Sequence, residues 1–455
     1  MLGTQLLLLL ILVIQSTGQL IRSFEMLIKT DQQFECSNTT CLPYSLTKAV
    51  NIGDCQVICL SQTQCQAATF HYSNSNCELF DNIVYQFGIM LNNIDTITMS
   101  VISGTRFSVG YNSINVQNRT IYPLTGFQPL NLAVKDINGD NKPDILTIDR
   151  SSSGMGVLLN RGNRTFFPEV LHTTGSAPFV VAVGDLNNDS KPDAVVSNTG
   201  SLAIGILINA GSGTFYPEYN LTIGGNVNPI TIADVNNDNK LDILYSFWSS
   251  HSVGVFFNDG NATFSSRTSY ATDASPIGIE YIDVNNDNQR DIITSNSDSN
   301  TVSILLGKGN ATFFPQSTYP VGISPSSLAV ADLNGDDSPD IVVTNSVSNT
   351  TSVLINRGNG SFLTQVLYNV GNGPSSVKIY DMNNDGYPDI IVANSNSNNI
   401  GILINKGDGS FFNQATFSVG ANPSAIVVDD IDSDGKSDII VTNSGSNNIA
   451  ILYQN

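Results

Sequence analysis

Acidic and amide side chains recur in this 455-residue chain at a fixed spacing. The string Asp-x-Asn/Asp-x-Asp-x-x-x-Asp occurs seven times, each copy starting 49 residues after the previous one (185 − 136 = 49 for the first pair). Oxygens from positions 1, 3, 5 and 9 of such a string, with the carbonyl oxygen of position 7, form the ligand set that calcium prefers. We therefore expect up to seven structural calcium ions.

The candidate ligands are the side chains at positions 1, 3, 5 and 9 of each string. In chain order they are Asp136, Asn138, Asp140, Asp144, Asp185, Asn187, Asp189, Asp193, Asp234, Asn236, Asp238, Asp242, Asp283, Asn285, Asp287, Asp291, Asp332, Asn334, Asp336, Asp340, Asp381, Asn383, Asp385, Asp389, Asp430, Asp432, Asp434 and Asp438. Position 6 must turn sharply, and Ser190 is its least suited occupant because the other six are Gly, Asn or Asp.

Asx-rich turns without a metal are the plain alternative. Three carboxylates about 5 Å apart would repel by roughly 3 kcal/mol per pair at an effective dielectric near 20, which opposes folding without a cation. Seven calcium ions would also reduce the formal net charge of -20 to -6 (-20 + 14 = -6). The seventh loop has four carboxylates, so we expect it to bind calcium most tightly.

The segments around these loops predict four strands in each period. In the copy that begins at Pro325, apolar runs indicate strands at 328–331 and 341–344, a third at 352–356, and a fourth from 361 towards 368. Four-stranded units repeated radially form propeller blades. The rival is a linear solenoid. However, the seventh copy stops after its third strand, and the segment near 114–124 resembles the missing fourth strand, so we expect a closed ring.

The N-terminal part of the chain predicts export. The apolar run from Leu6 to Ile14 is too short to span a bilayer and is typical of a signal peptide over residues 1–18. All six cysteines lie between Cys36 and Cys77, which indicates a disulfide-bonded module over residues 19–103. The 19 Lys and Arg residues are dispersed, which argues against nucleic-acid binding. We expect a freely secreted protein without a transmembrane segment, and the sequence does not indicate an oligomeric state.

Nine Asn-x-Ser/Thr sequons fit passage through the secretory route. They begin at Asn38, Asn118, Asn163, Asn188, Asn220, Asn261, Asn310, Asn349 and Asn359. Which of them carry glycans is left open.

The repeats resemble a known family. The strings Val419-Gly-Ala-Asn-Pro423, Val370-Gly-Asn-Gly-Pro374 and Val321-Gly-Ile-Ser-Pro325, each about ten residues before an acidic loop, are similar to FG-GAP repeats. The resemblance covers residues 104–455 and extends to VCBS-type repeats and the integrin α-subunit head. It implies an all-β, seven-bladed propeller that binds protein or glycan partners.

The cysteine module resembles the PAN/apple family, a small α+β fold. The similarity rests on Cys55-x3-Cys59-x5-Cys65 and on Cys77-Glu-Leu-Phe80, and it implies bridges from Cys55 to Cys77 and from Cys59 to Cys65. The remaining pair is Cys36 and Cys41. The third bridge of the family usually links the domain termini, so this pairing stays open.

We expect this protein to bind partners rather than to catalyse a reaction. His71, His172 and His251 do not recur at matching positions, and the repeated carboxylates are assigned to calcium. The recurrent Phe residues are expected to begin the fourth strands and to pack between blades. They are Phe166, Phe215, Phe264, Phe313, Phe362 and Phe411. A calcium-dependent lectin is the alternative, although Trp248 is the only tryptophan; a propeller hydrolase or lyase is less favoured.

The sequence also predicts which face binds. Turns between strands 1 and 2 and between strands 3 and 4 share one face, which places four hairpin sequons (Asn163, Asn261, Asn310 and Asn359) beside the acidic loops. The opposite face carries Asn/Ser-rich turns at 296–300, 345–349, 394–399 and 443–448. We hypothesise that a partner docks there; the alternative is that these segments are only well-solvated turns.

Overall fold

A computed structural model of the chain describes residues 119–454 in full and, before them, the backbone of eight strands. The chain divides into two compact units, Met1–Gly110 and Tyr111–Asn455. In the first unit the strands form one sheet in the order β1-β2-β8-β5-β6-β4, with β3 pairing β7 and β8. They are β1 (Leu9–Ser16), β2 (Gln19–Lys29), β3 (Gln32–Glu35), β4 (Pro43–Lys48), β5 (Cys65–His71), β6 (Asn76–Asp81), β7 (Ile89–Asn92) and β8 (Thr96–Val101).

The predicted disulfide bridges lie outside the described side chains. Cys65 and Cys77 fall on β5 and β6, of which the backbone alone is described. The other four cysteines, and the sequons at Asn38 and Asn118, lie outside the described residues. The bridges and the signal peptide therefore remain predictions.

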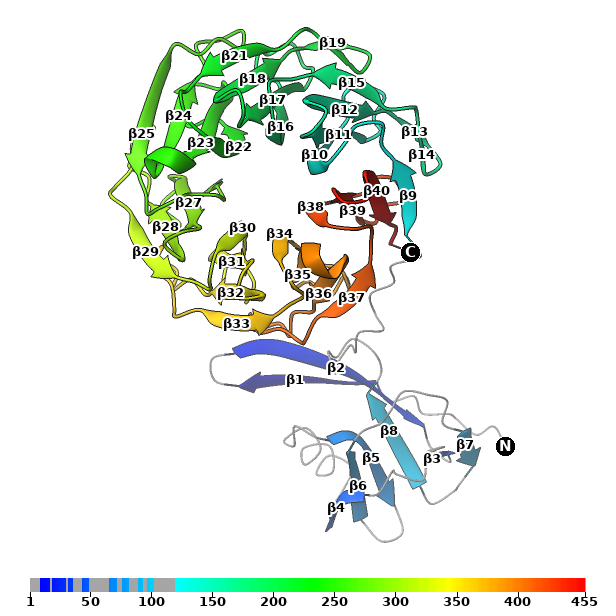
Figure 1. Cartoon of the computed structure of the whole chain (residues 1–455). Coiled ribbons are helices and arrows are strands. Elements are labelled where there is room, and N and C mark those ends of the chain that lie inside the picture. Colours follow the sequence, from blue (N-terminus) through cyan, green and yellow to red (C-terminus); the bar gives the residue numbers. More distant parts are fainter. Residues whose placement is uncertain are drawn as a thin grey trace. The chain divides into compact units, whose positions relative to one another are not determined.

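The second unit is a ring of seven antiparallel sheets, each with four strands (Figure 1). Blade 1 contains β10 (Pro129–Lys135), β11 (Asp144–Asp149), β12 (Gly154–Leu158) and β15 (Val170–Thr173); blade 2, β16 (Pro178–Gly184), β17 (Asp193–Asn198), β18 (Ala203–Leu207) and β21 (Tyr219–Thr222); blade 3, β22 (Val227–Ala233), β23 (Asp242–Phe247), β24 (Ser252–Phe257) and β25 (Ser266–Ala271); blade 4, β26 (Glu280–Ile282), β27 (Asp291–Asn296), β28 (Thr301–Leu305) and β29 (Ser317–Pro320); blade 5, β30 (Pro325–Ala331), β31 (Asp340–Asn345), β32 (Thr350–Leu354) and β33 (Val366–Asn369); blade 6, β34 (Pro374–Tyr380), β35 (Asp389–Asn394), β36 (Asn399–Leu403) and β37 (Ala415–Ser418); blade 7, β38 (Pro423–Asp429), β39 (Asp438–Asn443), β40 (Asn448–Leu452) and β9 (Thr120–Pro123).

The expected closure of the ring is confirmed. Strand β9, from the start of the propeller, pairs antiparallel with β40 at its end, with Tyr122 opposite Ile449. The hydroxyl groups of Tyr122 and Tyr453 are 2.9 Å apart across the same seam. Figure 1 shows β9 and β40 side by side, and the labelled first strands, β10, β16, β22, β30, β34 and β38, nearest the centre of the ring.

Burial of the second strand of each blade explains its sequence. In β31 and β35 all six residues are buried, which suits β-branched side chains that pack against the neighbouring blade on each side. The apolar clusters span blade boundaries. One of them joins Ile391 and Ile402 of blade 6 to Ile439 and Val441 of blade 7. The core is thus a set of layers between adjacent sheets.

The recurrent Phe residues pack between blades, as expected, but they do not begin the fourth strands. In blade 5 the fourth strand begins at Val366, and Phe362 lies in the preceding hairpin, where it bridges Asn356. The hairpin places each ring against the outer strand of the preceding blade. The ring of Tyr319 meets that of Phe362 edge-on at 5.4 Å, and Tyr368 meets Phe411 at the same distance.

Each Gly-x-x-Pro segment leads into the first strand of a blade, and its glycine is required for close packing. A Cβ on Gly371 would lie 2.6 Å from Cγ of Asn394, and a Cβ on Gly322 would lie 2.6 Å from Cγ of Asn345. Both asparagines are fully buried at the end of a second strand. The glycine therefore allows the incoming chain to contact a buried amide.

Candidate metal centre

The acidic loops connect the first and second strands of all seven blades and share one local conformation. Position 6 has a positive φ in every loop, including φ 67° at Ser190. Position 4 also has a positive φ throughout, which the sequence analysis missed. Its occupants are Gly139, Asn188, Asn237, Asn286, Gly335, Asn384 and Ser433. Six of these seven are Gly or Asn, so their composition was the available signal.

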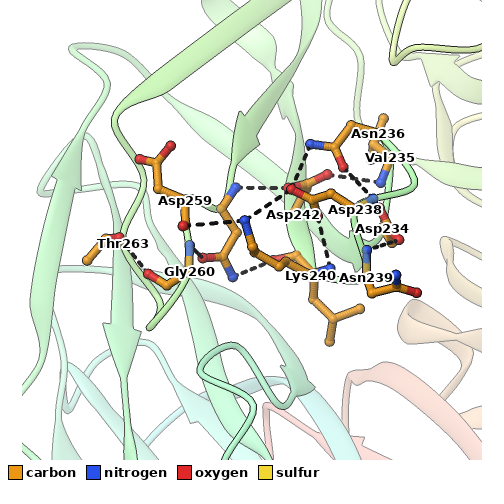
Figure 2. A network of polar contacts seen from close by, with 12 residues as sticks. Asp234, Val235, Asn236, Asp238, Asn239, Lys240, Asp242, Asp259, Gly260 and Thr263 are labelled. Carbon is orange, nitrogen blue, oxygen red and sulfur yellow. Dashed lines mark hydrogen bonds and ion pairs between the residues drawn. The ribbon is translucent and has the colours of Figure 1, made fainter.

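Figure 2 shows the acidic loop of blade 3, in which side-chain oxygens accept hydrogen bonds from backbone amides of the same loop. In blade 3, Asp234 accepts hydrogen bonds from the backbone N–H groups of Asp238 (3.1 Å) and Asn239 (2.8 Å). Oδ1 of Asn236 accepts a second contact from the Asp238 amide at 3.0 Å. The side chains at positions 1 and 3 are thereby bonded to the same backbone amide, that of position 5.

The carboxylate at position 9 is the first residue of the second strand and is fully buried in every blade. In blade 3, Oδ2 of Asp242 accepts from the Val235 amide at 2.9 Å, and Oδ1 accepts from the Asn258 amide at 2.9 Å. Burial raises the pKa of this carboxyl group, to about 6 at Asp340 and to about 7 at Asp389. Position 9 therefore connects its loop to the third strand whether or not a cation is present.

These donors fit a calcium ion. In the seventh loop a carboxylate oxygen from each of Asp430, Asp432 and Asp434 lies within 4.8 Å of the others. The other six loops have an Asn amide oxygen at position 3 in the same hydrogen-bonding pattern, for example Asn138 on the amide of Asp140 at 2.9 Å. All are hard oxygen donors, as calcium requires. The seventh loop thus brings together positions 1, 3 and 5, whereas its position 9 carboxylate, Asp438, lies outside this group at the start of β39; calcium binding itself stays a prediction.

An asparagine shortly after the third strand, two residues beyond its end in blade 6, was missed as a functional residue. Nδ2 of Asn405 donates to the carbonyl of Leu333 in the acidic loop of the preceding blade (2.8 Å) and to Pro388 in its own blade (2.9 Å). Its backbone amide donates to position 9, Asp389, at 2.8 Å. The same bond to the preceding loop is made in other blades by Asn160, Asn209, Asn258, Asn356 and Gln454. The acidic loops are therefore coupled around the ring.

Blade 4 interrupts this series. Gly307 stands where the asparagine is expected, so only its backbone amide remains to bond Asp291 (2.7 Å). A cavity of about 480 Å³ opens there between blades 3 and 4, lined by Tyr281, Arg290 and Phe313 among others. The boundary between blades 3 and 4 therefore lacks the side-chain bond found at the other blade boundaries.

The seventh loop has a cation of its own. Nε of Arg164, in the hairpin of blade 1, contacts Oδ2 of Asp432 at 2.6 Å, and the guanidinium stacks on Tyr453 at 4.2 Å. Small residues occupy the equivalent hairpin position in blades 2 to 6; they are Gly213, Ala262, Ala311, Gly360 and Gly409. Asp432 is likewise the only aspartate at position 3. Both exceptions meet at the seam where the ring closes.

The opposite side of the ring, which we call the turn face, is formed by the turns between strands 2 and 3 and by the segments that lead into each first strand. These two sets of turns bond to each other. In blade 6, Oγ of Ser395 donates to the Gly373 carbonyl at 2.6 Å, and the Asn372 amide donates to Oγ of Ser397 at 2.8 Å. The sequons in the hairpins (Asn163, Asn261, Asn310 and Asn359) are exposed among the acidic loops.

The two described histidine side chains are not part of an acid–base constellation. His172 packs edge-on against Phe215 at 5.3 Å, and burial lowers its pKa. Nδ1 of His251 accepts from the Ser275 amide at 3.0 Å in a surface turn. The side chain of His71 lies outside the described part.

A family model described as FG-GAP-like repeat matches residues 136–196, 191–245, 283–343, 332–392 and 381–441. A second family model, described as PAN domain, matches residues 32–95. No curated protein sequence matches the chain significantly. Within the described residues, no helix has both the length and the apolar character needed to cross a membrane.

Solved propellers are similar in fold at low sequence identity. A putative 6-phosphogluconolactonase from Bacteroides fragilis aligns with a TM-score of 0.53 and 12% identity, covering 80% of this chain and 98% of that protein. Virginiamycin B lyase from Staphylococcus aureus aligns with a TM-score of 0.52 and 13% identity, covering 74% and 99%. An Agrocybe aegerita lectin that recognises terminal N-acetylglucosamine aligns more loosely, with a TM-score of 0.47 and 19% identity over 64% and 80%. At these identities the likeness extends to the fold alone.

Proposed function

The chain belongs to the FG-GAP-like repeat proteins and carries a PAN domain before its repeats, and on this premise we propose that it is an extracellular, calcium-stabilised binding protein without catalytic activity. The turn face of the propeller and the PAN domain would contact its protein or glycan partners. The proposal rests chiefly on the repeated acidic loops: their position 9 carboxylates are fully buried, and in the seventh loop the oxygens of Asp430, Asp432 and Asp434 converge.

Calcium would be held by the side chains at positions 1, 3, 5 and 9 together with the position 7 carbonyl. Bound calcium would supply charge neutralisation and would hold the loop conformation. The loops are bonded to one another through residues such as Asn405. Calcium bound in one loop would therefore stabilise the conformation of the neighbouring loops, and calcium is expected to stabilise the whole ring.

The geometry of the loops supports a structural role over catalysis. The position 9 carboxylates are buried and accept backbone hydrogen bonds on both oxygens, so they are not open to a substrate. The exposed carboxylates at position 5 are engaged by neighbouring groups, for example Asp140 by Lys142 at 3.0 Å. A catalytic site needs an accessible nucleophile or base with an orienting partner. The loops do not offer one.

Partner docking on the turn face is supported by its rigidity and by the location of the sequons. Cross-bonds between neighbouring turns pre-order this surface, which lowers the entropy cost of binding. Glycans at the four hairpin sequons would cover the acidic-loop side and leave the turn face open. The sequon at Asn349 is the exception on the turn face, and its Oδ1 accepts from the Gly373 amide at 2.8 Å.

The test is a binding screen of the secreted full chain against immobilised extracellular-matrix proteins and a glycan array, in 2 mM calcium and in EDTA. Thermal unfolding is followed in the same two buffers, with magnesium as the control ion. The proposal requires calcium-specific stabilisation and at least one partner bound only in calcium. Equal thermal stability with calcium and EDTA would refute it, as would hydrolase or lyase turnover that persists in EDTA.

A further inference from the structure

The turn face contains a cavity of about 450 Å³ that does not belong to the acidic loops. Its lining comes from blades 1 to 4 and includes Arg150, Phe179, Thr199, Asn228 and Trp248. This volume lies within the range of small-ligand sites, which is about 300–1,000 Å³. Trp248 is 37% exposed and is the only tryptophan in the chain.

The repeat itself shows which lining residues the fold does not need. One lining position directly follows the second strand of each blade. In blade order its occupants are Arg150, Thr199, Trp248, Ser297, Ser346, Ser395 and Ser444. The hydroxyl groups of Ser346, Ser395 and Ser444 donate to a neighbouring backbone carbonyl at 2.6–3.0 Å, and Thr199 does the same at 2.8 Å. Arginine and tryptophan lack this hydroxyl group, so neither makes this framework bond.

A second position, which lies in the first strand of every blade except blade 4, departs from the repeat at the same place. Its occupants in blade order are Leu130, Phe179, Asn228, Ile277, Ser326, Ser375 and Ser424. The three serines bond to the next blade, for example Ser375 to the Pro423 carbonyl at 2.9 Å. Phe179, Asn228 and Ile277 replace that bond with different side chains, and all three line the cavity. At both positions, residues that replace the bonding serine therefore line the same cavity.

The chemistry of the wall indicates the ligand. The guanidinium of Arg150 is exposed and makes no ion pair within the described part of the chain. None of the residues lining the cavity is Asp or Glu, although the chain carries a net charge of -20. An unpaired arginine suits a bidentate contact to a carboxylate. An exposed indole offers a flat apolar surface to the C–H face of a sugar ring.

We propose that this cavity, the Trp248 pocket, binds a carboxylate-bearing sugar residue of an acidic glycan. Trp248 would stack on the ring, Arg150 would pair with the carboxylate, and Asn228 and Thr199 would contact hydroxyl groups. This assignment rests on the proposed binding function of the turn face and names its ligand class. A uronate and a sialate share the required chemistry.

The single tryptophan makes the pocket directly measurable, because emission changes report on Trp248 alone. The full chain in 2 mM calcium is titrated with a hyaluronan tetrasaccharide (uronate) and with 3′-sialyllactose (sialate), and with chitotetraose and lactose as neutral counterparts. We expect a saturable emission change with at least one acidic sugar, and binding about tenfold weaker for its neutral counterpart. A glutamate-rich peptide is the competing class; saturable binding of that peptide without binding of either acidic sugar would overturn the proposal.

Variants that restore the repeat residue separate recognition from folding. Arg150→Ser should remove the preference for the acidic sugar, a loss of about tenfold. Trp248→Ser removes the fluorescence signal and is followed by calorimetry, which should show weaker binding of the acidic sugar. Tyr216→Ser, which removes another exposed aromatic ring outside the pocket, is the control and should bind normally. Unchanged sugar binding in Arg150→Ser and Trp248→Ser would overturn the pocket assignment.

The partner screen distinguishes this failure from failure of the proposed function. If the wild-type chain binds matrix proteins or glycans in calcium while Trp248 emission does not respond to acidic sugars, the pocket assignment fails and the binding function stands. If the wild-type chain binds nothing in either buffer, both fail.

Discussion

Replacing Asp149 by asparagine should remove a pH-dependent destabilisation built into blade 1. Asp149 is fully buried at the end of β11, and its Oδ1 has no hydrogen-bond partner among the described residues. Burial, and then the charge of Glu169, raise its pKa from 3.8 to about 7. Thr147 Oγ1 lies 3.4 Å from the Asp149 carboxyl group and 3.5 Å from that of Glu169. Two acids therefore share one buried hydroxyl group.

The sign and size of the effect follow from proton linkage. Because the pKa of the folded state lies above that of the unfolded state, the folded protein binds this proton more tightly. The stabilisation of the folded state by this proton is complete below about pH 4 and is lost as the pH rises through 7. A shift from 3.8 to about 7 corresponds to about 4 kcal/mol, at about 1.4 kcal/mol per pH unit. Between pH 5 and pH 8 the loss is about 3 kcal/mol.

Blade 2 provides the matched control for this prediction. Asn198 occupies the position equivalent to Asp149, and its Nδ2 donates to Glu218 at 2.9 Å. Asp149→Asn should therefore form the same bond to Glu169, while Asn198→Asp should create a second pH-dependent acid pair. The two substitutions are expected to shift the pH dependence in opposite directions.

The assay is thermal unfolding from pH 5 to pH 8 in 2 mM calcium. Subtracting the wild-type curve cancels the other titrating groups. With an unfolding entropy of about 2.1 cal/mol/K per residue, 3 kcal/mol in a propeller of this size shifts Tm by about 4 °C. The Tm of Asp149→Asn, measured relative to that of wild type, should therefore rise by about 4 °C between pH 5 and pH 8. A difference in Tm between variant and wild type that does not change with pH would refute the raised pKa of Asp149.

Three further predictions test contacts between blades and within one blade. Arg164→Gly, which copies Gly213 and Gly360, should tighten calcium binding in the seventh loop by freeing Asp432; an unchanged calorimetric isotherm would contradict this. Phe411→Ala should lower the free energy of unfolding by roughly 3–5 kcal/mol because it leaves a cavity in a buried site between blades 5 and 6. The assay is denaturant unfolding, and a loss below about 1 kcal/mol would show that this contact contributes little to stability. Gly371→Ala should cost about 1–3 kcal/mol through collision with Asn394, and the double variant with Asn394→Ala should recover part of that in the same assay.

Much of the architecture was predictable because it repeats in the sequence. The seven copies of the acidic string, spaced 49 residues apart, indicated seven blades. The last copy lacks a fourth strand, which identified the segment that contains β9. The acidic loops were visible as a local pattern in which all candidate ligands lie within nine residues. Such local features depend on backbone geometry that short sequences determine.

Contacts between blades were harder to predict because they join residues far apart in the chain. Asn405 bonds to Leu333, 72 residues earlier, and Arg164 meets Asp432 across the seam of the ring. The recurrence of Asn160, Asn209 and Asn258 was visible, but its meaning depends on how adjacent sheets pack. The Trp248 pocket was missed for a similar reason, since its wall combines departures from the repeat in different blades.

A crystal of the secreted chain grown in 5 mM calcium would show whether the acidic loops hold the ion. We expect anomalous density between positions 1, 3 and 5 of the acidic loops, with the position 7 carbonyl within bonding distance, in a closed seven-bladed ring. Loops without density at that calcium concentration would contradict this expectation.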